Sequence, residues 1–117
     1  MSTFRIIKPS ACQTDIDHGF RRAWGITRQV AGSEFLSMGY GKLPVGIRAV
    51  AHEHDVETAI YLTRGIVRVD FGNGLKEHAI AGAGDFILIP AHVPHGPLAV
   101  GSEDVEYIVA RATPIAD

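Results

Sequence analysis

The sequence predicts an all-β fold, a small antiparallel β-barrel, from two observations. Thirteen glycines and six prolines interrupt the chain at short intervals, and stretches with helical periodicity are scarce. The runs between these breaks are short and rich in β-branched and aromatic residues, which is typical of the strands of sandwiches and barrels. The expected strands are residues 25–30, 34–40, 45–50, 58–62, 66–71, 78–81, 86–89 and 105–110.

The pattern within these runs indicates which side chains are buried. Val67, Val69 and Phe71 alternate with Ile66, Arg68 and Asp70. Alternate residues of a strand point to the same face, so this strand is expected to be buried mainly on one face. Asn73 and Gly74 follow it and predict a hairpin turn in which both residues have positive φ. The residues expected to line or fill the barrel are Ile60, Leu62, Val69, Phe86 and Leu88.

The composition indicates one soluble globular domain over residues 1–117. Hydrophobic residues make up 46% and charged residues 21%, which are ordinary values. The formal charge is −2 and the 11 basic residues are scattered, so the sequence argues against a nucleic-acid-binding surface. No apolar run is long enough to span a membrane. Cys12 has no second cysteine to pair with, and we expect a cytoplasmic protein.

Four of the six histidines fall in two short groups, His52-Glu53-His54 and His92-Val93-Pro94-His95. In an extended strand residues i and i+2 face the same way, so His52 and His54 can share one ion. A third ligand has to come from elsewhere, and the second group follows a predicted strand in the other half of the chain. Imidazole suits Fe, Zn and Ni, and a site with added oxygen ligands accepts Mn. The pattern predicts a divalent metal site.

The spacing around both groups resembles the two motifs of the cupin superfamily. Gly46 precedes His52 by six positions and Gly65 closes the following strand, as in G-x5-H-x-H-x(3,4)-E-x6-G. Gly84 and Pro90 precede His95, as in G-x5-P-x-G-x2-H-x3-N. The resemblance covers about residues 40–110. It implies a double-stranded β-helix of jelly-roll type in which His52, His54 and His95 are metal ligands.

Two positions depart from these motifs. Thr58 stands where the first motif has glutamate, and Glu57 lies one residue early. A slip of one residue reverses the face of a strand, so Glu57 becomes a ligand only if a bulge near Asp55 restores its aim. The alternative is a site made of histidine only. In the second motif, His92 replaces glycine, either because histidine tolerates positive φ there or because it is a fourth ligand.

Other candidate residues follow from the strand alternation. Arg48 shares the strand alternation of His52 and His54, so it is expected to point into the same cavity, where its partner would be Glu57 or a substrate carboxylate. The alternative is a bulge that turns Arg48 outward. Arg48 and Glu57 are the candidate catalytic residues. His18 and His78 are expected at the surface. Residues 1–20 predict an irregular lead-in or an edge strand that pairs with a second subunit.

The resemblance implies a metal-dependent enzyme that acts on a small organic acid or carbonyl compound. Dioxygenase chemistry is preferred over isomerase or lyase chemistry, because two or three histidines with Glu57 are similar to the facial site of iron oxygenases. One alternative is a metal-containing binding or sensor module without turnover. Another is a metal-free epimerase that uses histidine and tyrosine as acid and base. Cupins commonly pair through their outer strands, so a homodimer is expected.

Overall fold

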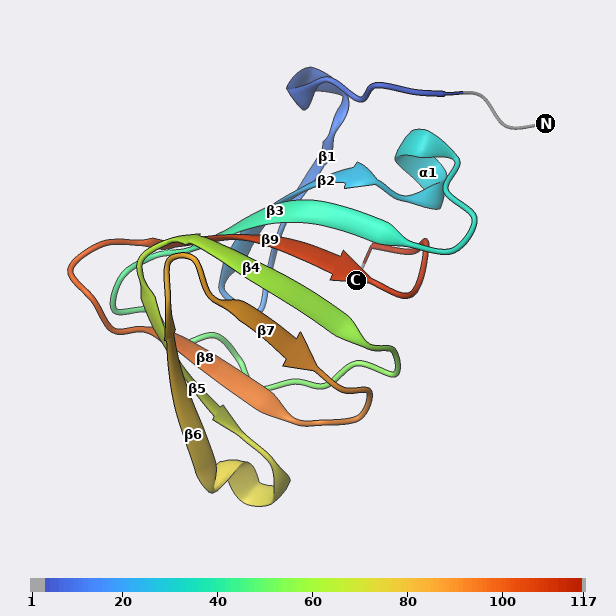
Figure 1. Cartoon of the computed structure of the whole chain (residues 1–117). Coiled ribbons are helices and arrows are strands. Elements are labelled where there is room, and N and C mark those ends of the chain that lie inside the picture. Colours follow the sequence, from blue (N-terminus) through green and yellow to red (C-terminus); the bar gives the residue numbers. More distant parts are fainter. Residues whose placement is uncertain (1–3, 117) are drawn as a thin grey trace.

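The computed structural model of the chain describes residues 4–116. Two antiparallel sheets face one another and enclose the interior of the domain (Figure 1). The six-stranded sheet has the order β1-β2-β3-β9-β4-β7, and the three-stranded sheet has the order β6-β5-β8. The strands are β1 (Gln13–Asp17), β2 (Phe20–Ile26), β3 (Ser37–Leu43), β4 (Thr58–Arg64), β5 (Ile66–Phe71), β6 (Glu77–Gly82), β7 (Phe86–Ile89), β8 (His95–Ala99) and β9 (Val105–Arg111). Three short helical turns complete the fold: η1 (Pro9–Ala11), α1 (Arg28–Ala31) and η2 (Asn73–Leu75).

Strand β9 lies in the middle of the six-stranded sheet and shows why the sequence folds this way. Val105, Tyr107, Val109 and Arg111 are buried, while the residues between them are only partly buried. This alternation is the period of a strand with one face toward a core. β9 pairs with β3 on one side and with β4 on the other. The buried residues of β9 therefore point toward the three-stranded sheet.

Residues 46–52 follow β8 without forming a regular strand. The backbone N–H of Gly46 donates to Ala99 and that of Ala49 donates to Pro97, over 3.2 and 2.9 Å. Farther along, His52 and His95 form an isolated antiparallel bridge. This segment thus adds an irregular fourth row to the three-stranded sheet. It brings the first histidine group beside the second.

The apolar core fills the space between the sheets. Trp24 and Leu43 are fully buried, and Leu62 is 1% exposed. The guanidinium carbons of Arg22 and Arg111 lie 5.2 and 5.5 Å from the centre of a Trp24 ring. Such cation–π contacts join the core to the polar part of the interior.

The predicted strands agree with the structure in the second half of the chain and differ in the first half. A strand was expected over residues 45–50, but this segment forms an isolated bridge at Arg48. The strand predicted over residues 25–30 is also wrong, because β2 ends at Ile26 and the short helix α1 follows. The side chain of Thr27 caps α1 by accepting from the Val30 N–H. Of the two alternatives given for residues 1–20, the edge strand forms, as β1.

Two local predictions need correction. Phe86 and Leu88 are 81% and 63% exposed, so they lie outside the core, and Ile87 and Ile89 line the interior instead. The hairpin between β5 and β6 forms as expected. Its turn is longer than two residues, however, and positive φ occurs at Gly72, Gly74 and Leu75. No helix among residues 4–116 is long and apolar enough to cross a membrane.

Candidate metal centre

Three histidines from the two groups come together inside the domain. Each of His52, His54 and His95 offers one nitrogen, and these atoms lie within 4.8 Å of one another. The backbones of His52 and His95 exchange two hydrogen bonds, of 3.0 and 2.9 Å. This bridge fixes the spacing of the two rings, whose centroids are 4.5 Å apart. Backbone pairing therefore assembles the cluster.

Hydrogen bonds at the Nδ1 atoms of His52 and His95 leave the Nε2 atoms of these two rings free to bind a cation. Nδ1 of His52 lies 2.7 Å from the Val50 carbonyl oxygen, and Nδ1 of His95 lies 2.9 Å from the Val93 carbonyl oxygen. A carbonyl oxygen can only accept, so each Nδ1 carries the proton and each Nε2 keeps its lone pair. Metal-binding histidines commonly have this second partner, which orients the ring. The donor set fits a divalent metal ion.

Burial favours the neutral form of these rings. Burial lowers the pKa of both His52 and His95 below the ordinary value of 6.5, against the hydrogen bonds to Val50 and Val93, which raise it. The nearby charge of Arg111 lowers both pKa values further. A metal ion binds neutral imidazole, so His52 and His95 are in their metal-binding protonation state near neutral pH.

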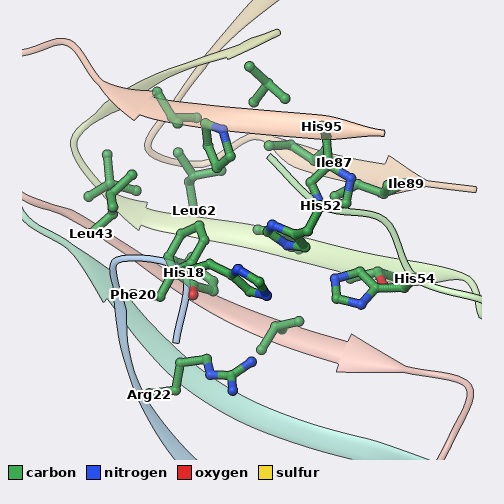
Figure 2. Close-up of a pocket in the computed structure, with 18 of the residues that line it drawn as sticks. His18, Phe20, Arg22, Leu43, His52, His54, Leu62, Ile87, Ile89 and His95 are labelled. Atoms are coloured by element: carbon green, nitrogen blue, oxygen red, sulfur yellow. The ribbon is translucent and has the colours of Figure 1, made fainter. Parts of the chain in front are cut away.

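A pocket opens beside the cluster, with walls from both sheets (Figure 2). Most of its surface is aliphatic or aromatic, and its polar side chains are gathered around the histidines. Its lining contains no acidic residue among those that the structure describes. The lining residues are His18, Phe20, Arg22, Leu43, His52, His54, Thr58, Ile60, Leu62, Val67, Val69, Ile87, Ile89, His95, Pro97, Val105, Tyr107, Val109 and Arg111.

The structure places Thr58, and not Glu57, on the side of the pocket. Thr58 is 1% exposed and begins β4, and the register of β4 with β9 is regular from Thr58 to Leu62. No bulge at the start of β4 turns Glu57 inward. The Glu57 side chain is exposed, and its carbonyl oxygen accepts from the Ala112 N–H over 3.3 Å.

The other two predicted residues, His92 and Arg48, also lie outside the lining of the pocket. His92 has a φ of 66° and an exposed side chain whose Nδ1 is 3.9 Å from Glu53. Positive φ is the backbone state expected where the second motif has glycine. Arg48 is exposed and forms a 3.0 Å ion pair with Asp70. The structure thus brings together three of the predicted site residues and separates the remaining three from them.

Sequence reasoning missed several residues of this pocket. His18 was expected at the surface, but it lines the pocket and its ring stacks on His52 at 4.3 Å with an interplanar angle of 8°. His18 has a φ of 52° and Gly19 a φ of 94°, so they form the tight turn between β1 and β2. The pair His18-Gly19 is typical of a tight turn, and this is the signal by which the sequence could have shown that His18 lies in a turn. Nothing in the sequence showed which part of the site this turn would reach.

Arg111 was also missed. Its Nη2 donates to Nε2 of His54 over 3.2 Å, because a guanidinium has no acceptor. Arg22 reaches the same pocket from β2 and forms ion pairs with Asp15 and Asp17. Tyr107 completes this group, and burial raises the pKa of its hydroxyl well above the ordinary value of 10.0. Alternation along β9 places Tyr107 and Arg111 on the inner face, but it does not place them beside histidines.

The fold and the histidine cluster define a class of small β-barrels with a candidate metal site, and sequence comparison gives the family. Residues 39–111, more than half of the chain, match the cupin domain model. The chain belongs to the cupin domain family. Among the curated proteins compared with this sequence, none matches it.

Solved structures share the fold at low sequence identity. The polyketide cyclase RemF from Streptomyces resistomycificus is 15% identical with a TM-score of 0.77, over 93% of this chain and 79% of that one. KdgF from Halomonas sp. is 20% identical with a TM-score of 0.72, over 98% and 97%. The oxalate decarboxylase OxdC of Bacillus subtilis is 21% identical with a TM-score of 0.79, and this chain spans 32% of its length.

Proposed function

We propose that this protein is a metal-dependent enzyme in which His52, His54 and His95 hold a divalent ion that acts on a small organic acid or carbonyl compound. The observation that carries the proposal is the meeting of three imidazoles in one pocket. Hydrogen bonds from Nδ1 to backbone carbonyl groups turn Nε2 of two of these rings toward a common ligand. A chance group of surface histidines would lack this orientation.

The residues of the chain give the ion a specific environment. A divalent ion held here would polarise a carbonyl or carboxyl oxygen as a Lewis acid. Ile60, Ile87 and Val109 are apolar lining residues of the pocket, and an apolar surround strengthens electrostatic contacts to a bound substrate. Imidazole donors suit Fe, Zn and Ni, and oxygen ligands from a substrate or water would also allow Mn; one solved structure of similar fold is described by its Mn(II) centres.

Metal analysis of protein purified without an affinity tag tests the proposal. We expect about one ion per chain in the parent protein and far less in His52→Ala and His95→Ala. His78→Ala is the matched control, because His78 is an exposed histidine on β6. Full metal content in both pocket variants would refute the site. Activity toward a panel of small hydroxy and oxo acids should then disappear on chelation and return on reloading.

Oxygenase chemistry remains a narrower proposal within this function. The sequence argument for it used Glu57 as a carboxylate ligand, and the exposed Glu57 side chain does not support that role. The three-histidine cluster supports isomerase or lyase chemistry equally. An oxygen electrode separates the two, because O₂ consumption with substrate identifies an oxygenase. Binding without turnover of substrate or O₂ would identify a sensor module.

We also propose a cytoplasmic homodimer. Phe86 and Leu88 expose large apolar surface on β7, an edge strand of the six-stranded sheet, and Ile80 on β6 is 67% exposed. An exposed edge strand with apolar side chains is suited to pairing with a second copy. Light scattering at micromolar concentration should give twice the mass of the chain, and Phe86→Glu should reduce it to the monomer. A monomeric parent protein would refute the dimer.

A further inference from the structure

We propose that Thr58 and Arg111 form a carboxylate-binding subsite beside the histidine cluster, so that the ligand itself supplies the carboxylate which the chain lacks at position 58. The ligand of this pocket is then a small carboxylate anion. This inference rests on the proposed function, because it names the part of the substrate that lies next to the metal-binding histidines.

The two residues are direct neighbours across two strands. Thr58 at the start of β4 is paired with Arg111 at the end of β9. Both residues are buried, and both line the pocket. Nη2 of Arg111 lies 3.2 Å from Nε2 of His54. A guanidinium and a hydroxyl are therefore held at the edge of the histidine cluster by the regular pairing of the sheet.

The hydroxyl of Thr58 has no hydrogen-bond partner within residues 4–116. A buried hydroxyl without a partner is destabilising, and such groups in a native fold call for an explanation. Thr58 is screened from solvent, so bulk water does not solvate its hydroxyl. A ligand oxygen within the pocket would accept a hydrogen bond from it. Thr58 thus has both the position and the unused donor that a ligand site requires.

The charges in the pocket favour an anion. Its described lining carries Arg22 and Arg111 and no acidic side chain. Arg22 is held by Asp15 and Asp17, with contacts of 2.8 and 3.1 Å. A divalent ion on three neutral imidazoles would add two positive charges beside Arg111. An anionic ligand compensates this positive charge, because burying a charge without a partner is costly in free energy.

The donors and their apolar neighbours suit a carboxylate. A guanidinium binds a carboxylate through two parallel N–H donors, and the Thr58 hydroxyl can add a third donor from β4. The neighbouring lining residues Ile60 and Val109 are apolar, which suits a short hydrocarbon or carbonyl substituent. If the ion takes the lone pair at Nε2 of His54, the N–H donor of Arg111 that lies there becomes available to the ligand.

The test uses the full chain loaded with Co²⁺, whose visible spectrum reports changes in its ligands. Pyruvate is titrated by calorimetry and by this spectrum, with uncharged pyruvamide and inorganic phosphate as comparisons. We expect pyruvate to bind best. Thr58→Val should weaken pyruvate binding about tenfold, and Arg111→Gln about a hundredfold. Co²⁺ affinity should stay unchanged in Thr58→Val, and Arg48→Gln, at an exposed arginine, should bind pyruvate like the parent protein.

A second variant separates the subsite from the metal site. Thr58→Glu places a carboxylate where the family motif has one, so it should tighten Co²⁺ binding and abolish pyruvate binding. Unchanged pyruvate binding in Thr58→Val or in Thr58→Glu would overturn the subsite, as would tighter binding of pyruvamide or phosphate. Thr58→Val keeps the side-chain shape and decides the question if Arg111→Gln does not fold. Failure of the parent protein to bind Co²⁺ overturns the metal proposal instead, and pyruvate titration of the metal-free chain still tests Thr58 and Arg111.

Discussion

The two walls of the pocket differ in chemistry and in origin. The wall formed by β8 and residues 46–54 carries the three histidines, which backbone pairing at His52 and His95 brings together. The wall formed by the six-stranded sheet carries Arg22, Thr58 and Arg111 on β2, β4 and β9. The histidine wall suits a cation, and the arginine wall suits an anion. A small acid bound between them would meet both.

This difference indicates that metal binding and ligand selection depend on different walls of the site. The histidine wall resembles the family motif at each of its three ligand positions, whereas the arginine wall departs from the motif at Thr58. Metal binding is therefore expected to depend on the first wall and ligand choice on the second. Removing a donor from one wall should leave binding at the other wall intact, and the Gly41→Ala prediction below tests this separation.

The largest effect is expected from His95→Ala in the histidine wall. Removing one of three nitrogen donors should lower metal affinity by more than about a hundredfold, because loss of an outer-shell partner alone costs roughly 10–100-fold. Titration with Co²⁺ or Zn²⁺ against a competing chelator measures the change. Affinity within threefold of the parent would contradict the assignment of this wall.

The next effect is a dependence of stability on pH. Burial holds the pKa of His52 and His95 below 6.5 in the folded protein, so the unfolded chain binds more protons below that pH. Stability of the metal-free protein should therefore be full above pH 6.5 and should fall as the pH drops through the lowered pKa values. Calorimetric melting between pH 7.5 and 5.0 measures it. The double variant His52→Asn/His95→Asn should give a flatter profile; an equal slope would contradict this origin.

A moderate effect is expected from Gly41→Ala, which perturbs the inner face of the arginine wall through Tyr107. A Cβ at Gly41 would overlap the ring of Tyr107, its partner on β9. The displaced ring should cost about 1–3 kcal/mol of stability and should weaken ligand binding while metal affinity changes little. Urea unfolding and metal titration measure the two quantities. Loss of metal binding in a folded Gly41→Ala protein would show that the walls are coupled.

The smallest effect is expected from Glu57→Gln. The side chain of Glu57 is exposed and lies outside the lining of the pocket. Metal affinity should change less than twofold, because an exposed carboxylate contributes little to a buried cation site. Metal titration beside His95→Ala provides the comparison. A tenfold loss would show that Glu57 reaches the ion after all.

The sequence predicted the histidine wall better than the arginine wall for a physical reason. His52 and His54 are neighbours in the chain and His95 stands at a motif spacing, so local order is informative. Arg111 reaches His54, which lies 57 positions earlier in the chain, only through the pairing of β4 with β9. The class of fold was predicted from turns and short runs. The register of β4 was not, and it decides that Thr58 rather than Glu57 faces the pocket.

The position of Trp24 gives the protein an internal optical reporter. It is the sole tryptophan of the sequence and is fully buried. Its ring lies about equally far from the guanidinium groups of Arg22 and Arg111, and both arginines line the pocket. Indole emission responds to nearby charge, so a ligand that moves or neutralises either arginine changes the fluorescence of this one residue. Occupancy of the arginine wall can thus be followed in the unlabelled protein.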